Sequence, residues 1–179
     1  MGERAVNVQR VVPAPIGTPL WHAALSLRID VFVVEQNVPI ELERDDADDD
    51  ARTRHLVIAA PDRATAAATV RWVIEPVGFA GIDPELGAPV HLQRLAVART
   101  WRGQGLGAAL VDAVEQEAAA IGALAVYLAA QREAVAFYDR LGYRAYGEPF
   151  PEAGIEHRHM VRVLGPGAAR PRQVEPPPG

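Results

Sequence analysis

A glycine-rich turn between an apolar run and an amphipathic segment constrains this chain more than any other feature. The run covers residues 92–97 and is typical of a strand, and residues 105–121 follow the turn with apolar side chains at helical spacing. A glycine-rich turn that opens a helix leaves backbone N–H groups free, and the helix dipole favours negative charge there. The turn is therefore either a phosphate-binding loop or a purely structural link. Its residues are Arg102, Gly103, Gln104, Gly105, Leu106 and Gly107.

The spacing of the glycines excludes two common nucleotide-binding loops. The dinucleotide fingerprint G-x-G-x-x-G does not fit Gly103, Gly105 and Gly107, and no Gly-Lys-Ser/Thr follows as a P-loop requires. The pattern Arg/Gln-x-x-Gly-x-Gly/Ala does fit, with Arg102 at its first position. It resembles the pyrophosphate loop of the GNAT superfamily, the acyl-CoA-dependent N-acyltransferases.

Composition narrows the class of protein. The 179 residues, 49% of them hydrophobic, suffice for one domain with a core. A net charge of -5 argues against nucleic acid or an acidic membrane as a partner. The absence of cysteine excludes disulfides, thiolate metal sites and a cysteine nucleophile. Residues 1–10 lack the apolar segment of a signal peptide and no run approaches a membrane span, so we expect a cytoplasmic protein.

Hydrophobic periodicity predicts a mixed α/β sheet with helices packed on it, in the order β-α-β-β-β-α-β-α-β-β. The first helix should begin after Thr18 as N-cap and end at Asn37 and Pro39. Its expected apolar face comprises Leu20, Ala24, Leu27, Val31 and Val34. The other helices are expected at residues 105–121 and 133–141. Strands are expected at residues 6–12, 55–59, 66–74, 92–97, 123–129, 143–146 and 157–164, and residues 76–89 should form a loop.

The domain should span residues 1–165, followed by a disordered tail at residues 166–179 that is rich in proline and glycine. The GNAT resemblance covers about residues 5–165 of this domain and includes several separated motifs in the same order. In the second half the motif is Phe137-Tyr138-x-x-Leu141-Gly142-Tyr143. In the first half, Leu27-Arg28-x-x-Val31-Phe32-Val33-Val34-Glu35-Gln36-x-Val38-Pro39 resembles the ElaA-like subgroup. So do the acidic run with Glu43, Asp45 and Asp48, His55-Leu56, Leu128-Ala129-Ala130-Gln131 and Glu152-x-Gly154-Ile155-x-His157-x-x-Met160.

The resemblance implies that acetyl-CoA is the cosubstrate and that residues 102–107 bind its pyrophosphate. In the superfamily, splayed central strands leave backbone N–H groups unpaired, which implies that Leu95, Ala96 and Val97 hold the pantetheine amides and the oxyanion. Gln131 lies seven residues before Tyr138, where many members carry an asparagine that contacts the coenzyme. The glutamate that members often carry at the start of the central strand is absent, and His91 occupies that neighbourhood.

Three residues are candidates for proton transfer in an attack by an amine on a thioester. Tyr138 is the candidate acid for the leaving thiolate, and its alternative is a packed aromatic with a hydrogen-bonded hydroxyl. Glu35 and His91 are the candidate bases. Glu35 follows Arg28 by seven residues, so an ion pair between them on one helix face is its alternative. His91 could act directly or through water, or could be an edge-strand histidine without a catalytic role.

The acceptor site is less defined by the sequence. Arg28, Arg94 and His157 are candidate substrate-lining residues, and Arg94 should face away from His91 and Gln93 if the strand is regular. Arg94 would then anchor a substrate carboxylate or pair with an acid in the sheet. The acidic segment, residues 41–50, is either a solvated loop or a rim that attracts a cationic amine. We expect no metal site, because His157 and His159 alone offer two ligands.

These observations predict an N-acetyltransferase that moves an acetyl group from acetyl-CoA to a primary amine of a small molecule or peptide by direct attack. One alternative is an acyl-CoA-binding sensor without catalysis, since fold does not guarantee chemistry. Another is a protein-interaction module that uses residues 41–50. An exposed last strand also offers a surface for a homodimer.

Overall fold

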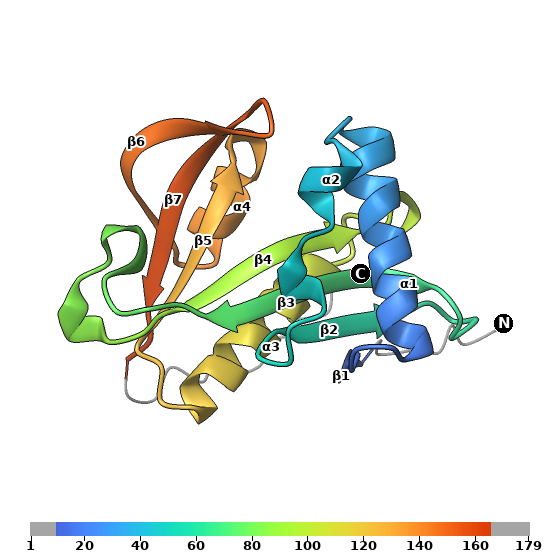
Figure 1. Ribbon diagram of the computed structural model, residues 1–179, viewed down its shortest axis with the longest axis horizontal. Helices are drawn as coiled ribbons and strands as arrows, with labels where there is room; N and C mark the ends of the chain where they lie inside the picture. The colour runs from blue at the N-terminus through green and yellow to red at the C-terminus, as the bar shows by residue number, and fades with distance from the viewer. Residues whose placement is uncertain (1–9, 166–179) are drawn as a thin grey trace, which may run out of the picture.

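The computed structural model describes residues 10–165, which form a seven-stranded mixed sheet flanked by helices on both faces (Figure 1). The strand order is β1-β2-β3-β4-β5-β7-β6, and among the described residues only β4 and β5 pair in parallel. The strands expected within this range are present, while residues 6–9 and 166–179 lie outside the described part. The strands are β1 (Val11–Pro13), β2 (Arg54–Ala59), β3 (Ala66–Ile74), β4 (Val90–Val97), β5 (Ala125–Gln131), β6 (Arg144–Glu152) and β7 (Ile155–Val163).

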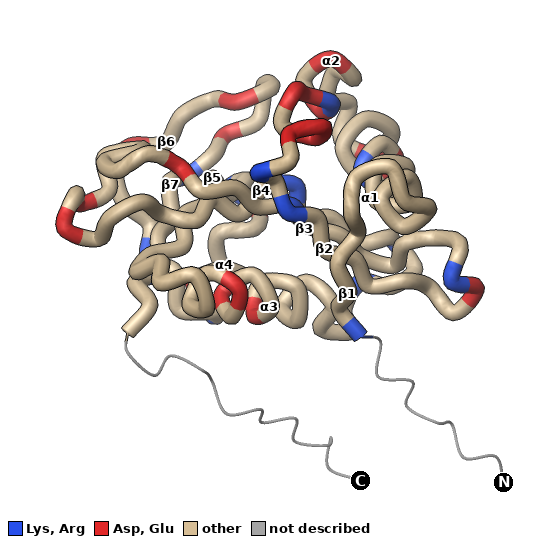
Figure 2. The backbone as a smooth tube through the Cα atoms, turned by 60° about the horizontal axis from the view of Figure 1, so that its bottom comes forward, with Lys and Arg blue, Asp and Glu red and all other residues tan. Residues whose placement is uncertain are grey.

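Helix α1 (Pro19–Arg28) packs on one face of the sheet, and α3 (Leu106–Ala120) packs with α4 (Val135–Arg140) on the other (Figure 2). A separate apolar core lies on each face, one built around α3 and one around α1. The acidic segment carries two short helical turns, α2 (Ile40–Glu43) and η2 (Asp46–Asp48), that the sequence did not predict. Single 3-10 turns complete the chain: η3 (Phe79–Gly81), η4 (Pro84–Leu86), η5 (Arg99–Trp101) and η6 (Arg132–Ala134). No helix in residues 10–165 is both long enough and apolar enough to cross a bilayer.

The first helix begins after Thr18 as predicted, but it changes character after Arg28. Residues Ile29–Glu35 form a π-helix, η1, rather than more α-helix. A π-helical turn holds more residues than an α-helical turn, so side chains three apart no longer share a face. Val31 is therefore buried at 5% exposure, whereas Val34 is 68% exposed. The prediction that Val34 belongs to the apolar face was wrong for this reason.

Strand β4 contains a bulge at Arg94, which has a positive φ of 55°. Thr69 pairs with Ala96 and Arg71 pairs with Gln93, so β4 holds one more residue than β3 over this interval. The bulge interrupts the alternation of faces. Arg94 and Gln93 consequently both reach toward the α1 side, where they contact the acidic segment and Arg71 respectively. The expectation that Arg94 would face away from Gln93 assumed a regular strand and was wrong.

The bulged half of β4 also separates from β5. The two strands pair only at Val90 with Val126 and at His91 with Tyr127, and they then diverge in Figure 1. The backbone of Leu95, Ala96 and Val97 therefore has no strand on its β5 side. This is the splayed arrangement that the family resemblance implied.

Candidate functional site

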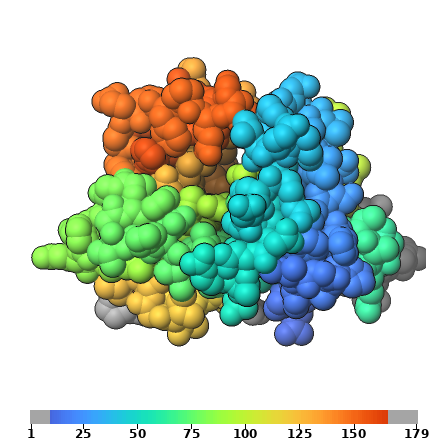
Figure 3. All heavy atoms as spheres, in the orientation of Figure 1, coloured from blue at the N-terminus to red at the C-terminus, as the bar shows by residue number. Residues whose placement is uncertain are grey.

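A cavity of about 1080 Å³ opens where β4 and β5 diverge. In the space-filling view it appears as a hollow between the N-terminal half, in blue and cyan, and the C-terminal strands, in orange (Figure 3). Residues from η1, β4, the start of α3, β5, α4, β6 and β7 line it. The cavity brings together every predicted site residue except Arg28 and Gln104.

The glycine turn forms one end of the cavity. Gly103 and Gly105 have φ values of 76° and 79°, a region that side-chain-bearing residues rarely adopt. No side chain caps α3, and its first backbone bond runs from the Ala109 N–H to the Gly105 carbonyl. A Cβ on Gly107 would lie 3.3 Å from Cζ of Phe137, so the helix packs closely here. The uncapped N–H groups at this end fit a diphosphate.

Arg102 is held in place beside this turn. Its Nε donates to the Val97 carbonyl at 3.0 Å, and its Nη2 donates to the Glu35 carboxylate oxygens at 3.0 and 2.9 Å. Glu35 thus pairs with Arg102, and the alternative pairing with Arg28 was wrong. The Gln104 amide instead turns back to the Thr100 carbonyl at 3.3 Å.

Arg28 lies in a buried charge cluster and does not line the cavity. Its guanidinium, 2% exposed, donates to the Glu43 carboxylate and carbonyl and to both Asp48 oxygens, at 2.6 and 3.1 Å. Its prediction as a substrate-lining residue was therefore wrong. A lone arginine on an apolar helix face gave no sign that its partners lay 15 and 20 residues further along the chain.

The same cluster neutralises much of the acidic segment. Arg71 donates to Asp45 at 2.6 Å and to Asp48 at 2.8 Å, and Arg94 pairs with Glu43 at 3.0 Å and Asp45 at 3.3 Å. Arg94 thus pairs with acids, one of its two predicted alternatives, while its stem still lines the cavity. The segment as a whole is neither a solvated loop nor an unpaired acidic rim.

Burial raises the pKa of these carboxylates, whereas the neighbouring arginines lower it. Burial alone would raise the pKa of Asp48, but hydrogen bonds and charges from Arg28 and Arg71 hold it well below its usual range. The pKa of Asp45 is lowered in the same way, with Arg71 outweighing burial. Burial prevails only at Glu43, whose pKa is raised despite Arg28 and Arg94.

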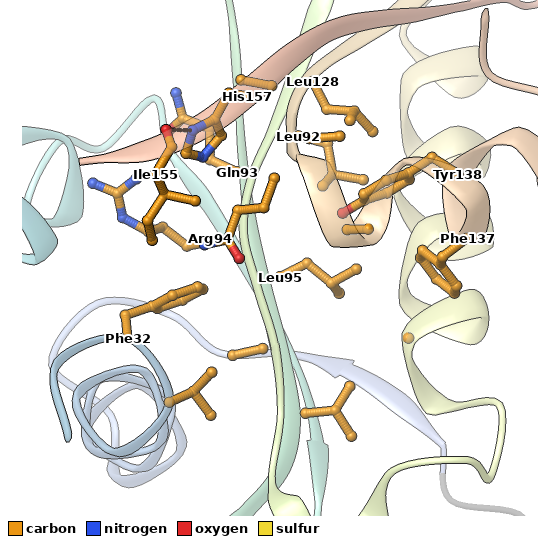
Figure 4. A pocket seen from close by; sticks show the side chains of 18 of the residues that line it. Phe32, Leu92, Gln93, Arg94, Leu95, Leu128, Phe137, Tyr138, Ile155 and His157 are labelled. Atoms are coloured by element: carbon orange, nitrogen blue, oxygen red, sulfur yellow. Dashed lines mark hydrogen bonds between the residues drawn. The ribbon is translucent and has the colours of Figure 1, made fainter. Parts of the chain in front are cut away.

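Tyr138 projects from α4 into the middle of the cavity. In Figure 4 its hydroxyl points toward the space beside Leu92 and Leu95 of β4. The residue is only 7% exposed, and burial raises the pKa of its hydroxyl well above the ordinary value. The hydroxyl therefore stays protonated at neutral pH. On β5, the Gln131 amide donates to Gln36 at 2.7 Å across the cavity.

His91 has an orienting partner that the sequence did not reveal. Its Nδ1 lies 2.7 Å from Oε1 of Glu75, and the Gln93 amide nitrogen lies 2.9 Å from the same Nδ1 atom of His91. With a proton on Nδ1, His91 donates to Glu75 and its Nε2 is left as an acceptor, and Nδ1 then takes no hydrogen bond from the Gln93 amide. Glu75 stands at the start of the loop over residues 76–89, and only the fold brings it beside His91.

Aromatic and histidine rings line the other end of the cavity. We call this set the ring wall: Phe79, His91, Tyr127, Phe150, His157 and His159. His159 accepts or donates a hydrogen bond with Tyr127 at 2.8 Å and stacks on Phe150 at 4.2 Å. Phe79 comes from the 76–89 loop, which Tyr146 ties to β6 through the Ala80 carbonyl at 3.0 Å.

The β6–β7 hairpin positions most of this wall. β6 runs past the predicted end to Glu152, where a turn with positive φ at Ala153 and Gly154 reverses the chain. His157 lies on the same face as His159, as predicted, and lines the cavity with its Nδ1 bonded to the Ile155 carbonyl at 2.8 Å. The described residues hold no group of three side chains able to bind a metal.

Comparisons with known proteins agree with this geometry. Residues 49–164 match the model of the acetyltransferase (GNAT) domain. The uncharacterized N-acetyltransferase YjcF of Bacillus subtilis is 34% identical over 140 residues, which cover 78% of this chain and 89% of YjcF. An acyl-CoA N-acyltransferase from Pseudomonas aeruginosa superposes with a TM-score of 0.70 at 31% identity and covers 86% of this chain and 98% of its own. Escherichia coli ElaA superposes with a TM-score of 0.70 at 26% identity, and the match covers 86% of this chain and 99% of ElaA.

The family match includes β4, the glycine turn, β5 and Tyr138, which are the parts that build the cavity. The structural likeness extends over both halves of the sheet and includes the ElaA-like relative that the sequence motifs suggested. The chain belongs to the GNAT acetyltransferase family.

Proposed function

We propose that this protein transfers the acetyl group of acetyl-CoA to a primary amine of a small molecule or peptide by direct attack. The observation that carries the proposal is one continuous cavity with an uncapped helix N-terminus at one end and His91 at the other. Tyr138 lies between them. Family membership supports acyl transfer, and the cavity geometry supports an acyl-CoA donor.

The residues around the glycine turn fit the coenzyme. The N–H groups of residues 103–107 would bind the pyrophosphate, with Arg102 nearby as a cation. Leu95, Ala96 and Val97 would offer backbone groups to the pantetheine amides and the oxyanion, since β5 does not pair with them. Gln131 lies on the facing strand and would contact the coenzyme from there.

The chain's own residues would manage the protons of the reaction. Acetyl-CoA supplies a thioester, whose carbonyl carbon bonds to the amine nitrogen while the carbon–sulfur bond breaks. His91 Nε2 would take a proton from the substrate ammonium before the neutral amine attacks, and Tyr138 would give its proton to the departing sulfur. The nitrogen loses its second proton after the carbon–nitrogen bond forms, and this proton restores the Tyr138 hydroxyl. The products are then the amide, the CoA thiol and one proton held by His91.

We assign the base to His91 rather than to Glu35. Glu35 lies at the glycine-turn end of the cavity and is held by both hydrogen bonds to Arg102. Its charge is better suited to fixing Arg102 than to accepting a proton. His91 lies at the other end, where Glu75 orients it.

Replacing Glu75 by glutamine should lower kcat/KM about tenfold, because the uncharged amide no longer stabilises a protonated His91. Steady-state kinetics at neutral pH would measure the fall in kcat/KM. Glu85→Gln, at an exposed position of the same loop, is the control. An unchanged kcat/KM in Glu75→Gln would remove the pair from the mechanism.

The coenzyme site can be tested by thermal unfolding with and without acetyl-CoA. A ligand at about a hundred times its Kd stabilises a protein by roughly 2.7 kcal/mol, which is several degrees at this size. Ala108→Glu places a carboxylate in the first turn of α3, on the lining of the cavity, and should abolish the shift. A negative charge near a helix N-terminus is stabilising, so the glutamate variant should keep its fold.

Ala109→Glu is a matched control, because it adds the same charge one residue later at an exposed position outside the cavity. It should keep the acetyl-CoA shift. Loss of the shift in both variants, or in neither, would argue against the proposed coenzyme site. A shift without turnover of any amine would favour the alternative of an acyl-CoA-binding sensor.

The interaction-module alternative loses its basis, since three acidic residues of the 41–50 segment already pair with arginines of the same chain.

β6 is an edge strand with mostly exposed side chains, and we propose it as the surface for a homodimer.

A further inference from the structure

We infer that the acceptor is an amine with a flat aromatic body and no carboxylate, in the manner of an arylalkylamine. The inference rests on the proposed function and concerns the end of the same cavity that lies away from the glycine turn. Two independent observations carry it: the ring wall and the charges around it.

The ring wall is continuous. His91 and Tyr127 meet at 4.7 Å between ring centroids, and Phe79 lies 5.4 Å from each of them. His159 then links Tyr127 to Phe150. Rings at such distances present broad apolar faces, on which another ring gains both buried area and favourable edge or stacking contacts. A slender aliphatic chain would leave much of this surface uncovered.

The charges at this end favour a cation and disfavour an anion. Among the described lining residues, no lysine or arginine belongs to the ring wall or to the β6–β7 turn beside it. Arg94, the nearest cation along β4, pairs with Glu43 and Asp45. Burial lowers the pKa of His159, with Arg158 adding to the effect, so this imidazole is neutral at neutral pH. A substrate carboxylate would enter without a partner for its charge.

Carboxylates, in contrast, stand at two places near the wall. Glu152 lines the cavity beside His157, and Glu75 lies behind His91. The negative charges of these two carboxylates would attract one ammonium group toward His91. The rings of Phe79 and Tyr127 would add cation–π contacts to it. A polyamine carries several charges and would need more acceptors than Glu152, because Glu75 is engaged by His91.

The test compares amines that differ in one feature, with CoA thiol release as the readout. The pair 2-phenylethylamine and phenylalanine differs only in the carboxylate, and hexylamine and spermidine replace the ring by aliphatic chains. We expect kcat/KM for 2-phenylethylamine to exceed that for phenylalanine about a hundredfold, as an unpaired buried charge predicts. The chain has 18 arginines and no lysine, so acetylation of lysine side chains of the protein itself adds no background CoA release.

Phe150→Leu tests the ring wall directly. Phe150 lies on the outer hairpin, so the leucine should be tolerated, while the stacked surface on His159 and His157 is reduced. We expect kcat/KM for 2-phenylethylamine to fall about tenfold and that for hexylamine to change little. The acetyl-CoA melting shift should stay as in the wild type, because Phe150 is remote from the glycine turn.

The outcomes separate this inference from the proposed function. Acetyl-CoA could raise the melting temperature while phenylalanine, hexylamine or spermidine is turned over faster than 2-phenylethylamine. This result would overturn the acceptor class and leave the acetyltransferase proposal standing. An acetyl-CoA shift without turnover of any amine tested would also overturn the acceptor class. No shift at all would remove both proposals together.

Discussion

Replacing Asp48 by asparagine should destabilise the protein by about 3–5 kcal/mol, the range found when one partner of a buried ion pair is removed. Asp48 is fully buried, and its carboxylate receives Arg28 Nη1 at 2.6 Å and Arg71 Nη1 at 2.8 Å. Asparagine has nearly the same shape but no charge. Two buried guanidinium groups would then share a single amide oxygen, while the amide nitrogen would face them as a competing donor.

Chemical denaturation of the two proteins would measure the difference in the free energy of unfolding. Asp49→Asn is the matched control, since Asp49 is 60% exposed and pairs only with the partly exposed Arg44 in the described structure. Exposed pairs contribute about 1 kcal/mol or less, so this variant should behave like the wild type. Equal losses in the two variants would show that the cluster is not a buried ion network.

The same carboxylate should govern acid stability. Because the pKa of Asp48 is lower in the folded than in the unfolded state, its contribution is present above about pH 4 and is lost as pH falls toward the folded value. Asp45 acts in the same direction, and Glu43, with its raised pKa, acts in the opposite one. Wild-type stability should therefore fall below about pH 4, and the Asp48→Asn protein should show a shallower fall.

The sequence predicted those parts of the fold whose signals are local. The glycine turn, the start of α1 and the buried strand β5 each follow from neighbours in the chain, and they appear where expected. The bulge at Arg94 and the π-helix were not predictable in this way. Both depart from the regular spacing on which a periodicity argument depends, and both redirect side chains at the cavity.

Long-range pairing explains the remaining differences. From the sequence, Arg28 was predicted to line the substrate site, but in the fold it forms ion pairs with Glu43 and Asp48. Glu75 gave no signal as a partner of His91, because the two residues are 16 positions apart and meet only through the β3–β4 pairing. The ring wall combines one loop residue with residues of four strands, so no single stretch of sequence predicts it.

Replacing Tyr138 by phenylalanine should lower kcat about a hundredfold and leave the affinity for acetyl-CoA nearly unchanged. General acid catalysis contributes factors of this size, and only the oxygen atom is lost. The ring would keep its contacts with Phe137 and Tyr143, at centroid distances of 4.9 and 5.7 Å, so the packing of α4 should persist. Single-turnover rates and equilibrium binding would separate the two quantities.

Tyr143→Phe is the matched control, because Tyr143 is a neighbouring buried tyrosine outside the cavity lining. It removes the same atom from the same region and should leave kcat close to the wild-type value. The role of the proton itself can be separated from positioning by the leaving group. A thiol more acidic than that of CoA departs without protonation, so an acetyl thioester of such a thiol should reduce the penalty of Tyr138→Phe. An unchanged kcat with acetyl-CoA would remove Tyr138 from the mechanism, and an equal loss with both donors would make it a positioning residue rather than the acid.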